Sequence, residues 1–452
     1  MAAVSMSPTP PMPEPAELEI ATLGPSRRVS PVGSRNAPFV DETNRILLPS
    51  KTAEIEPYIE SGAAVPSFEP AGPRREIFFD PGELTCGILT CGGLCPGLNN
   101  VIRSIVLQLY YSYGVKRILG FRYGYAGLSS THGHEPFELG PDAVAHLHER
   151  GGTLLASSRG KQDVGDMVDN LVKRNVGILF VIGGDGGLSG ALEISREIER
   201  RGLDIGIVGV PKTIDNDLLW TWRTFGFATA VKAASEVILA AHAEALGAWN
   251  GVGLVKLMGR HSGFIAAHAT LACSDVNFCL VPEVPFRLEG QGGFLAALRD
   301  RLEKKRHAVV VVAEGAGQEL FTNEEAGGAK FDPSGNVVLQ DIGVYLRDRI
   351  VQDFADRKIE TTVKYIDPSY TIRSLPANSF DAQLCLVLGQ YAVHAAMAGR
   401  TRMVVGVWNH HFTHIPLELA VSGSKQIDPD DEAWQRVIES TGQPAWMSVS
   451  GS

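Results

Sequence analysis

The sequence has few cysteines, and none of them forms a CxxC pair. The six are Cys86, Cys91, Cys95, Cys273, Cys279 and Cys385. Zinc sites and thioredoxin-like redox sites use CxxC pairs, so neither kind of site is expected. A chain of 452 residues can bury a core without a disulfide framework, and we expect reduced thiols.

Long basic runs and long apolar runs are also absent. The net charge is −10 and no basic face is evident, which disfavours binding to nucleic acid. No apolar run approaches the ~20 residues that cross a bilayer. The N-terminus has no charged start followed by an apolar core, so no secretory signal is expected. We therefore predict a cytoplasmic protein without membrane or nucleic-acid partners.

The body of the chain alternates short apolar runs with helical segments. Hydrophobic residues make up 44% of the sequence and charged residues 20%, which is ordinary for a globular protein of two or three domains. Strand, turn and helix recur in that order, which predicts an α/β fold with mostly parallel sheets and helices on both faces. In such folds, ligands bind at the carboxyl ends of the strands.

Both ends of the chain differ from this body in composition. Residues 1–73 hold many prolines, serines and alanines without strong hydrophobic periodicity, so we predict an extended or poorly ordered N-terminal segment. Residues 426–452 are acidic and then polar, which predicts a weakly ordered tail.

The stretch from Ile178 to Asp217 carries the strongest functional pattern. Ile178–Ile182 is predicted to be a buried strand, and the turn GGDGG follows it. Glycines have no Cβ atom, so a bulky anion can approach the backbone amides of this turn. A helix over Ala191–Arg200 would point its positive end at the turn. A second strand, Ile205–Val210, leads to the acidic loop TIDND.

Acidic and basic side chains around this turn suit phosphoryl transfer. Asp185 is a candidate ligand for Mg²⁺, which such sites hold by one or two carboxylates and phosphate oxygens. Asp215 and Asp217 stand two residues apart, and one could accept the proton of a hydroxyl group. Lys212 precedes them and could neutralise a phosphate. Each residue alone could equally serve turn geometry, but the combination favours a phosphoryl-transfer site.

The remaining phosphate-binding candidates are a second glycine-rich turn and three arginines. The turn CGGLCPG follows the predicted strand Glu83–Thr90; it lacks the GK[ST] of a Walker motif and the spacing of GxGxxG. Arg159, Arg260 and Arg373 each end a strand or a loop, where a guanidinium can bind phosphate in a bidentate way.

The motifs together resemble those of the 6-phosphofructokinase family. TCGGLCPGLN, IGGDGG, PKTIDND, KLMGRHSGF, a strand ending at Glu314, and YTIR occur in that family's order and cover about residues 74–420. The pattern is similar to the ATP-dependent branch that is built on a pyrophosphate-type body, as in plants and trypanosomatids. The resemblance implies ATP-dependent phosphorylation of fructose 6-phosphate at its 1-hydroxyl, a step of glycolysis, with Mg²⁺.

The resemblance also implies a domain arrangement. Two similar Rossmann-like domains would flank the active site, which would lie in the cleft between them. Residues 74–225 plus about 372–425 would bind the phosphoryl donor, and residues 226–371 would bind the sugar phosphate. Relatives form tetramers, so the resemblance implies a homo-oligomer, dimer or tetramer, and an allosteric enzyme.

Position by position, the resemblance implies three groups of site residues. Asp215 would be the general base, with Lys212 and Asp217 also catalytic. The donor would be bound by Gly92, Arg159, Gly160, Gly184, Asp185, Gly186 and Gly187, with Asp185 holding Mg²⁺. Fructose 6-phosphate would be bound by Thr213, Ile214, Asp215, Met258, Gly259, Arg260, Glu314, Tyr370, Thr371, Ile372 and Arg373.

The choice of donor depends on Gly186 and Lys212. In this family a glycine after the metal-binding aspartate leaves room for the α-phosphate of ATP, whereas an aspartate there accompanies pyrophosphate. Gly186 therefore favours ATP. Lys212 is similar to the lysine of pyrophosphate users, but the ATP-dependent branch carries it too. Gly187 departs from the threonine or serine of most relatives, so we expect a lost side-chain contact to the donor.

Two alternatives stay open at this stage. One is a pyrophosphate-dependent fructose 6-phosphate phosphotransferase. The other is a regulatory subunit without activity, whose signature would be loss of Asp185 or Asp215; both residues are present.

Overall fold

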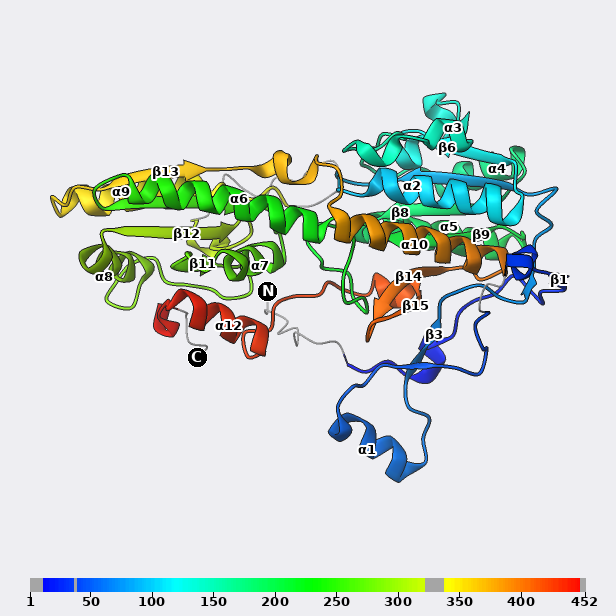
Figure 1. The fold of residues 1–452 in the computed structure, drawn as a ribbon, viewed down its shortest axis with the longest axis horizontal. Coiled ribbons are helices and arrows are strands. Elements are labelled where there is room, and N and C mark those ends of the chain that lie inside the picture. The colour runs from blue at the N-terminus through cyan, green and yellow to red at the C-terminus, as the bar shows by residue number, and fades with distance from the viewer. Residues whose placement is uncertain (1–10, 36–38, 322–336, 448–452) are drawn as a thin grey trace.

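The computed structural model describes residues 11–35, 39–321 and 337–447. These residues form two α/β bodies that lie along the long axis of the molecule (Figure 1). The first body is built on a nine-stranded sheet and the second on a four-stranded sheet. Within the described ranges, no helix is both long and apolar enough to cross a membrane. The six cysteines are all free thiols, as predicted.

The sheet of the first body has a parallel centre, and its strands run in the order β2-β3-β15-β14-β9-β8-β5-β6-β7. Strands β14, β9, β8, β5 and β6 are parallel, while β15 and β7 pair antiparallel at their two sides. The strands of this body after the N-terminal segment are β5 (Thr85–Thr90), β6 (Arg117–Phe121), β7 (Phe137–Glu138), β8 (Val176–Gly183), β9 (Gly206–Pro211), β14 (Met403–Trp408) and β15 (His411–Pro416).

Helices cover both faces of that sheet. Ile178, Phe180 and Ile182 of β8 pack into one apolar cluster, with α2 (Leu98–Leu107) and α10 (Ser379–Met397). Leu179 and Val181 point into the opposite cluster, with α4 (Val164–Lys173) and α5 (Asp185–Arg200). This double burial explains why β8 is an unbroken apolar run rather than an alternating one. Two short helices, α3 (Pro141–Val144) and α11 (Leu417–Ala420), complete the body.

The second body repeats the design with four parallel strands in the order β11-β12-β10-β13. The strands are β10 (Gly251–Leu257), β11 (Phe278–Leu280), β12 (His307–Ala313) and β13 (Thr362–Ile366). Helices α6 (Phe227–Leu246) and α7 (Phe264–Cys273) share one apolar cluster with the sheet, and α8 (Phe294–Lys305) and α9 (Ile342–Asp356) share the other. The predicted fold class, two Rossmann-like α/β domains, is confirmed.

The two ends of the chain are more structured than their composition predicted. The N-terminal segment contains β1 (Arg28–Val29), β2 (Ile46–Leu47), α1 (Thr52–Ser61) and β3 (Ser67–Pro70); β1 pairs with β4 (Glu76–Ile77), and β3 pairs with β15. Helix α1 buries no side chain and projects from the body (Figure 1). Isolated apolar anchors such as Leu18 and Phe68, both fully buried, hold the segment without any periodic pattern.

The C-terminal tail also differs from its prediction. Residues Glu432–Thr441 form α12, which packs against α7 and β11 of the second body (Figure 1). Trp434 and Val437 are buried in the core cluster. A single amphipathic helix in a polar context is enough to place the tail on the second body.

Candidate functional site

Three turns meet at the carboxyl ends of β5, β8 and β9. The backbone N–H of Lys212, after β9, donates to the carbonyl oxygen of Gly183, at 2.9 Å. A Cβ atom on Gly184 would lie 2.8 Å from the carbonyl oxygen of Lys212. Gly92, after β5, has φ +82°, and a Cβ there would lie 3.2 Å from Nζ of Lys212. The glycines are therefore required by close backbone packing as well as by any bound anion.

The GGDGG turn is the first turn of α5. The helix begins at Asp185 with Gly184 as its N-cap, six residues before the start that the sequence predicted. Its first amides have no partner within the helix and lie at the positive end of its dipole. A Cβ atom at Gly186 would meet no atom within 4 Å, so the turn is open on that side.

Tyr125 and Cys91, which were not predicted as site residues, contact this turn. The hydroxyl of Tyr125 donates a short hydrogen bond to the carbonyl oxygen of Gly187. A Cβ on Gly187 would lie 3.0 Å from Cβ of Cys91, closer than side chains normally pack. A threonine or serine at this position would therefore require Cys91 to shift by a few tenths of an ångström.

The TIDND loop is closed on itself by hydrogen bonds. Thr213 Oγ1 donates to Oδ1 of Asp217 at 2.9 Å and accepts from the backbone N–H of Asp215 at 3.1 Å. Asn216 has φ +55°, a left-handed conformation that asparagine tolerates better than most residues. Its Oδ1 accepts from the backbone N–H of Thr224 at 2.9 Å. The loop therefore holds Asp215 in a fixed position.

The carboxyl group of Asp215 lies in a strongly perturbed environment. Its Oδ1 is buried and has no hydrogen-bond partner among the described residues. Burial raises the pKa of Asp215 from 3.8 to about 8; Asp217 and Glu314 add to this shift, and Lys212 and Arg373 oppose it. A carboxyl group that titrates near neutral pH and lies at the junction of two bodies is suited to proton transfer.

The perturbed carboxyl group predicts a stability effect. Because the folded protein binds a proton at Asp215 that the unfolded chain has released, stability falls as the pH rises from about 4 to about 8. Asp215→Asn removes this cost. We expect the melting temperature of the variant to exceed that of the wild type by a few degrees at pH 8.5 and by less at pH 5. An equal or lower melting temperature at pH 8.5 would contradict the assignment.

Positive charge gathers over the CGGLCPG turn. Lys212 is buried, and its Nζ donates to the carbonyl oxygen of Gly93 at 2.8 Å. A Cβ on Gly93 would lie 3.0 Å from Nη1 of Arg373 and 3.8 Å from Nη2 of Arg159. Burial and the nearby Arg159 lower the pKa of Arg373. Three cations from separate segments thus converge on one turn, an arrangement that favours a polyanionic ligand.

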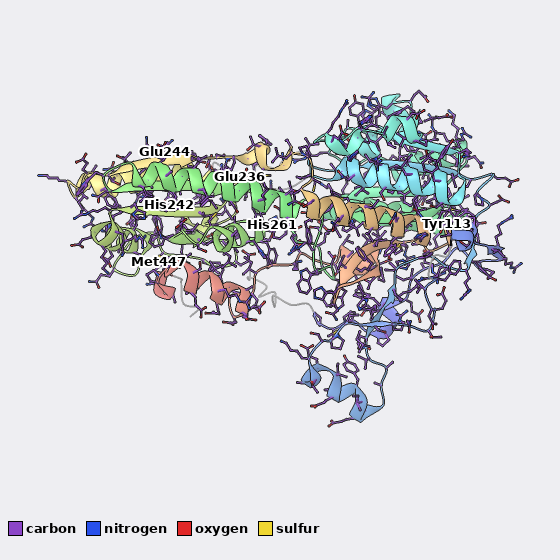
Figure 2. The ribbon with its side chains drawn as sticks, viewed as in Figure 1. Tyr113, Glu236, His242, Glu244, His261 and Met447 are labelled. Carbon is purple, nitrogen blue, oxygen red and sulfur yellow. The ribbon has the colours of Figure 1, made fainter. Side chains whose placement is uncertain are left out.

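The second body contributes side chains to the same place. Ser262 Oγ, after β10, donates to the carbonyl oxygen of Asp215 at 3.3 Å. Burial raises the pKa of Glu314, at the end of β12, while Arg260 opposes that shift. Figure 2 shows His261 where the two bodies meet. Burial lowers the pKa of His261, and the nearby carboxylates of Asp217 and Asp185 oppose this.

The 3₁₀ helix Ser369–Arg373 exposes some of its predicted site residues and buries others. Tyr370 is 70% exposed, and its ring lies 4.8 Å from the guanidinium carbon of Arg373. Ile372 is 1% exposed and packs in the core, as Ile214 does at 6%. The side chains of both isoleucines therefore face the core rather than the site, and only their backbones could contact a substrate.

The remaining predicted residues are less constrained. Thr371 Oγ1 donates to the carbonyl oxygen of Pro368 at 2.6 Å. Met258 is half-buried against the core. Gly259 and Gly160 have positive φ values of +133° and +103°, and they are adjacent to Arg260 and Arg159 respectively.

The acidic residues at the junction fit a divalent cation. Burial raises the pKa of Asp185, and the neighbouring carboxylate of Asp217 raises it further. A cation between such carboxylates would relieve their repulsion. No group of three or more histidine, cysteine or acidic side chains is arranged to hold a metal in the described part of the chain. If Mg²⁺ binds here, Asp185 would hold it together with phosphate oxygens of a donor, since Mg²⁺ typically binds one or two carboxylates and phosphate oxygens.

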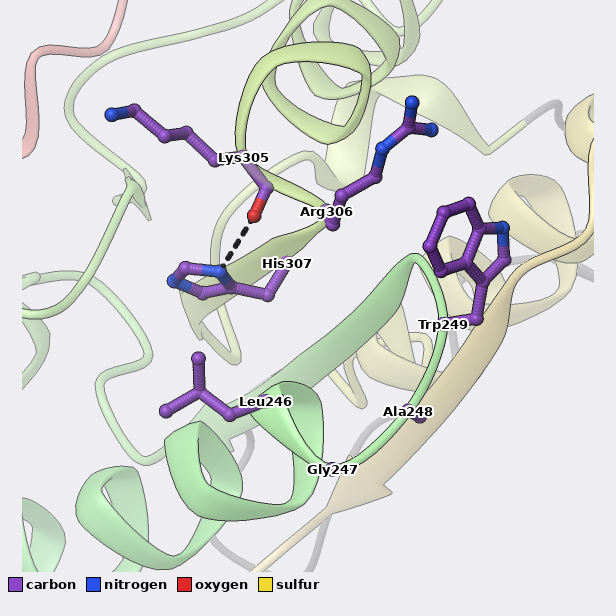
Figure 3. Close-up of a pocket in the computed structure, with 7 residues that line it drawn as sticks. All are labelled: Leu246, Gly247, Ala248, Trp249, Lys305, Arg306 and His307. Atoms are coloured by element: carbon purple, nitrogen blue, oxygen red, sulfur yellow. Dashed lines mark hydrogen bonds between the residues drawn. The ribbon is translucent and has the colours of Figure 1, made fainter.

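Two hollows lie far from this junction, at the amino ends of β10 and β12. One, of about 350 Å³, is lined by Leu246, Gly247, Ala248, Trp249, Lys305, Arg306 and His307 (Figure 3). Its neighbour, of about 430 Å³, includes His242, Asp275 and Arg301. Neither contains any of the predicted site residues, so neither is a candidate for the chemistry.

Comparison with known proteins gives the same family as the motifs. The model of the family "Phosphofructokinase" matches residues 85–396. The ATP-dependent 6-phosphofructokinase of Amycolatopsis methanolica is 49% identical over 438 residues, which is 95% of each chain. ATP-dependent 6-phosphofructokinase 1 of Arabidopsis thaliana is 45% identical over 90% of this chain and 85% of its own. The enzyme of Trypanosoma cruzi is 47% identical over 82% of this chain and 76% of its own.

A solved structure supports the fold independently. The pyrophosphate-dependent phosphofructokinase from Marinobacter aquaeolei has a TM-score of 0.65 at 20% identity, covering 81% of this chain and 93% of that one. At this identity the likeness shows the fold alone. Together with the family match and the plant and trypanosome relatives, it confirms the predicted resemblance. The chain belongs to the phosphofructokinase family.

Proposed function

We propose that this protein transfers the γ-phosphoryl group of ATP to the 1-hydroxyl of fructose 6-phosphate. The observation that carries the proposal is the junction of the two bodies. There the buried Oδ1 of Asp215, which has no hydrogen-bond partner in the described part of the chain, lies near Lys212, Arg373 and Glu314. The relatives named ATP-dependent 6-phosphofructokinase, at 45–49% identity over most of the chain, support it.

The donor is bound by the three turns of the first body. Gly184, Gly186 and Gly187 offer the amides at the start of α5 to its phosphates. Gly92 and Gly160 allow the backbone to approach. Arg159 and Lys212 neutralise charge as it moves to the leaving group.

Asp215 acts as the general base. Its carboxylate accepts the proton of the 1-hydroxyl as the oxygen attacks phosphorus, and its raised pKa matches this task at neutral pH. Asp217 acts with it, because Thr213 Oγ1 links the two residues. Because the site is buried, electrostatic interactions between these charged groups are stronger than they would be in water.

The sugar phosphate is bound mainly from the second body. Arg260 and Arg373 bind the 6-phosphate, because guanidinium groups match phosphate oxygens in pairs. Glu314 accepts hydrogen bonds from sugar hydroxyls. Met258, Gly259, Tyr370 and Thr371 line the sugar, and Ile214 and Ile372 contribute their backbone only.

Mg²⁺ would be held by Asp185. When bound, it neutralises phosphate charge and aligns the donor for in-line transfer. The side chains of this chain then orient the hydroxyl and remove its proton.

ATP rather than pyrophosphate is the proposed donor because the turn is open at Gly186. No atom lies within 4 Å of a Cβ atom placed there, so this side of the turn has room for an additional phosphate. Lys212 is compatible with either donor, since its Nζ contacts Gly93 rather than the open side.

The proposal is tested by product analysis. Purified full-length protein is incubated with fructose 6-phosphate, ATP and Mg²⁺, and the product is identified by ³¹P NMR and an aldolase-coupled assay. We expect fructose 1,6-bisphosphate and ADP in equal amounts. Absence of the bisphosphate with every phosphoryl donor would refute the proposal in favour of a silent subunit.

Arg373 is one of the two arginines proposed to bind the 6-phosphate, so its removal should weaken the binding of fructose 6-phosphate strongly. We expect Arg373→Met to raise KM for fructose 6-phosphate by about 10²-fold, because a hydrogen-bonded charge pair in a buried site contributes 2–5 kcal/mol. Arg436→Met, which removes an exposed arginine paired with Glu432, is the matched control. An unchanged KM for Arg373→Met would show that Arg373 does not bind the 6-phosphate.

We also propose a cytoplasmic homo-oligomer, a dimer or tetramer, under allosteric control. The glycolytic substrate supports the compartment. Leu239, Leu246 and Trp249, on α6 and just after it, are each more than half exposed, and a second copy would cover them. Sedimentation of a monomer at micromolar concentration would contradict the oligomer.

A further inference from the structure

Four residues, Ser424–Ile427, connect the two bodies, and we call them the crossing segment. They contact residues 213–224, which carry Asp215 and Asp217 and which we call the catalytic loop. The chain leaves the first body after α11 and enters the second at α12, and the crossing segment lies between them (Figure 1). Its hydrogen bonds reach both bodies. None of its residues belongs to the predicted site.

On the side of the first body, the crossing segment binds the catalytic loop. The backbone N–H of Lys425 donates to the carbonyl oxygen of Asp217 at 2.6 Å. Leu218 and Ser424 form an isolated antiparallel bridge. Nζ of Lys425 donates to the carbonyl oxygens of Thr221 and Trp222 at 3.0 and 3.1 Å.

On the side of the second body, the same segment binds the loop that follows β10. Nε2 of Gln426 donates to the carbonyl oxygen of His261 at 3.0 Å. The backbone N–H of Ile427 donates to Oε1 of Glu283 at 2.9 Å, and the Glu283 carboxylate also accepts from the backbone N–H of Gly263. Arg260 precedes this loop, so its backbone is tied to the crossing segment through His261 and Gly263.

The catalytic loop needs such support. Two of its residues that are not glycine, Asn216 and Trp220, have φ values of +55° and +58°. Conformations of this kind are unfavourable for residues other than glycine and persist only when the surroundings hold them. Carbonyl groups at a turn must also find donors. The half-buried ammonium of Lys425 supplies two donors to one loop, which a neutral apolar side chain cannot do.

We propose that Lys425 is a positioning residue for phosphoryl transfer: it holds the loop of Asp215 and Asp217 at a fixed distance from the sugar-phosphate loop around Arg260. It does so through its ammonium on Thr221 and Trp222 and its amide on Asp217, while Gln426 and Ile427 fix the other side. The inference rests on the proposed function and adds a residue that touches neither substrate.

The test compares Lys425→Met with Lys425→Arg in the full-length protein. We expect Lys425→Met to lower kcat by about 10- to 100-fold, because small displacements of reacting groups have effects of that size. KM for ATP should change less than threefold, since the donor turns do not contact Lys425. Lys425→Arg keeps the charge and the donors and should restore most of kcat. Lys232→Met, which removes an exposed lysine paired with Glu236, is the control.

Hydrogen exchange supplies a readout that does not depend on activity. We expect backbone amides of residues 213–224 to exchange faster in Lys425→Met than in the wild type, and at the wild-type rate in Lys425→Arg. A normal exchange rate in Lys425→Met would overturn the proposal, whatever happens to kcat. A normal kcat would overturn it as well. An inactive wild type would refute the proposed function, and exchange would still decide whether Lys425 holds the loop.

A second variant covers the case in which Lys425→Met does not fold. Gln426→Ala removes only the side-chain bond to His261. We expect a rise of a few-fold in KM for fructose 6-phosphate, with kcat lowered by less than about tenfold relative to the wild type. Unchanged constants in a folded Gln426→Ala protein would overturn the positioning role of the crossing segment.

Discussion

Asp215→Asn is expected to lower kcat by about 10²–10⁴-fold, the contribution that a positioned general base makes. Asparagine has the shape of aspartate but cannot accept a proton at neutral pH. The loop should keep its form, because its hydrogen bonds use the backbone N–H of Asp215 and the side chains of Thr213, Asn216 and Asp217. KM for fructose 6-phosphate should therefore stay within a few-fold of the wild type.

The pH dependence provides a separate check on this role. Because the base form of a group with a pKa of about 8 grows as the pH rises, kcat/KM of the wild type should increase from pH 6 to about pH 8 and then level off. In Asp215→Asn the low residual rate should lack this rise. A variant with near-normal kcat, or one that keeps the rise, would remove Asp215 from the role of base.

Gly186→Asp is expected to lower kcat/KM for ATP by about 10²-fold or more. A Cβ at this position meets no atom within 4 Å, so the variant should fold and keep its melting temperature. Its carboxylate would stand in the open side of the donor turn, where like charges cost several kcal/mol. Steady-state rates with ATP, and with pyrophosphate as a second donor, measure the change.

Two matched substitutions separate size from charge at this position. Gly186→Asn has nearly the same volume as aspartate without its charge, and Gly186→Ala adds only a methyl group. We expect kcat/KM for ATP to be highest in Gly186→Ala, lower in Gly186→Asn and lowest in Gly186→Asp. Unchanged use of ATP by Gly186→Asp would contradict the argument that space at this position selects the donor.

The buried centre of the fold could be predicted from the sequence because its strands are continuous apolar runs. Ile178–Ile182 lies within β8, and Ile205–Val210 overlaps β9. The pattern of continuous apolar runs does not predict the last strand, β15. Its sequence, HFTHIP, reads as polar, but His414 is buried and bonds to Glu69 of β3, at 3.1 Å. β15 forms a hairpin with the neighbouring β14 and also pairs with β3, more than 300 residues earlier in the chain, so the burial of its histidine is explained by a contact that no local pattern reveals.

A site residue could be predicted where a single motif contains both the residue and the strand or turn that positions it. Asp185 and Asp215 stand at the ends of strands, and the structure brings them to one junction. The supporting residues could not be predicted, because their roles come from contacts between distant segments. Tyr125 beneath Gly187 and Lys425 behind Asp217 have no local signal. Ile372 was included through its motif alone, and its side chain faces the core.

The central claim is ATP-dependent phosphorylation of fructose 6-phosphate, and the ratio of kcat/KM for ATP to that for pyrophosphate tests it most directly. Both donors are measured with saturating fructose 6-phosphate and Mg²⁺ on the same wild-type preparation. The open turn at Gly186 predicts a ratio above about 10², with fructose 1,6-bisphosphate formed in proportion to the ATP consumed. A ratio at or below one would contradict the account and assign the protein to the pyrophosphate-dependent enzymes.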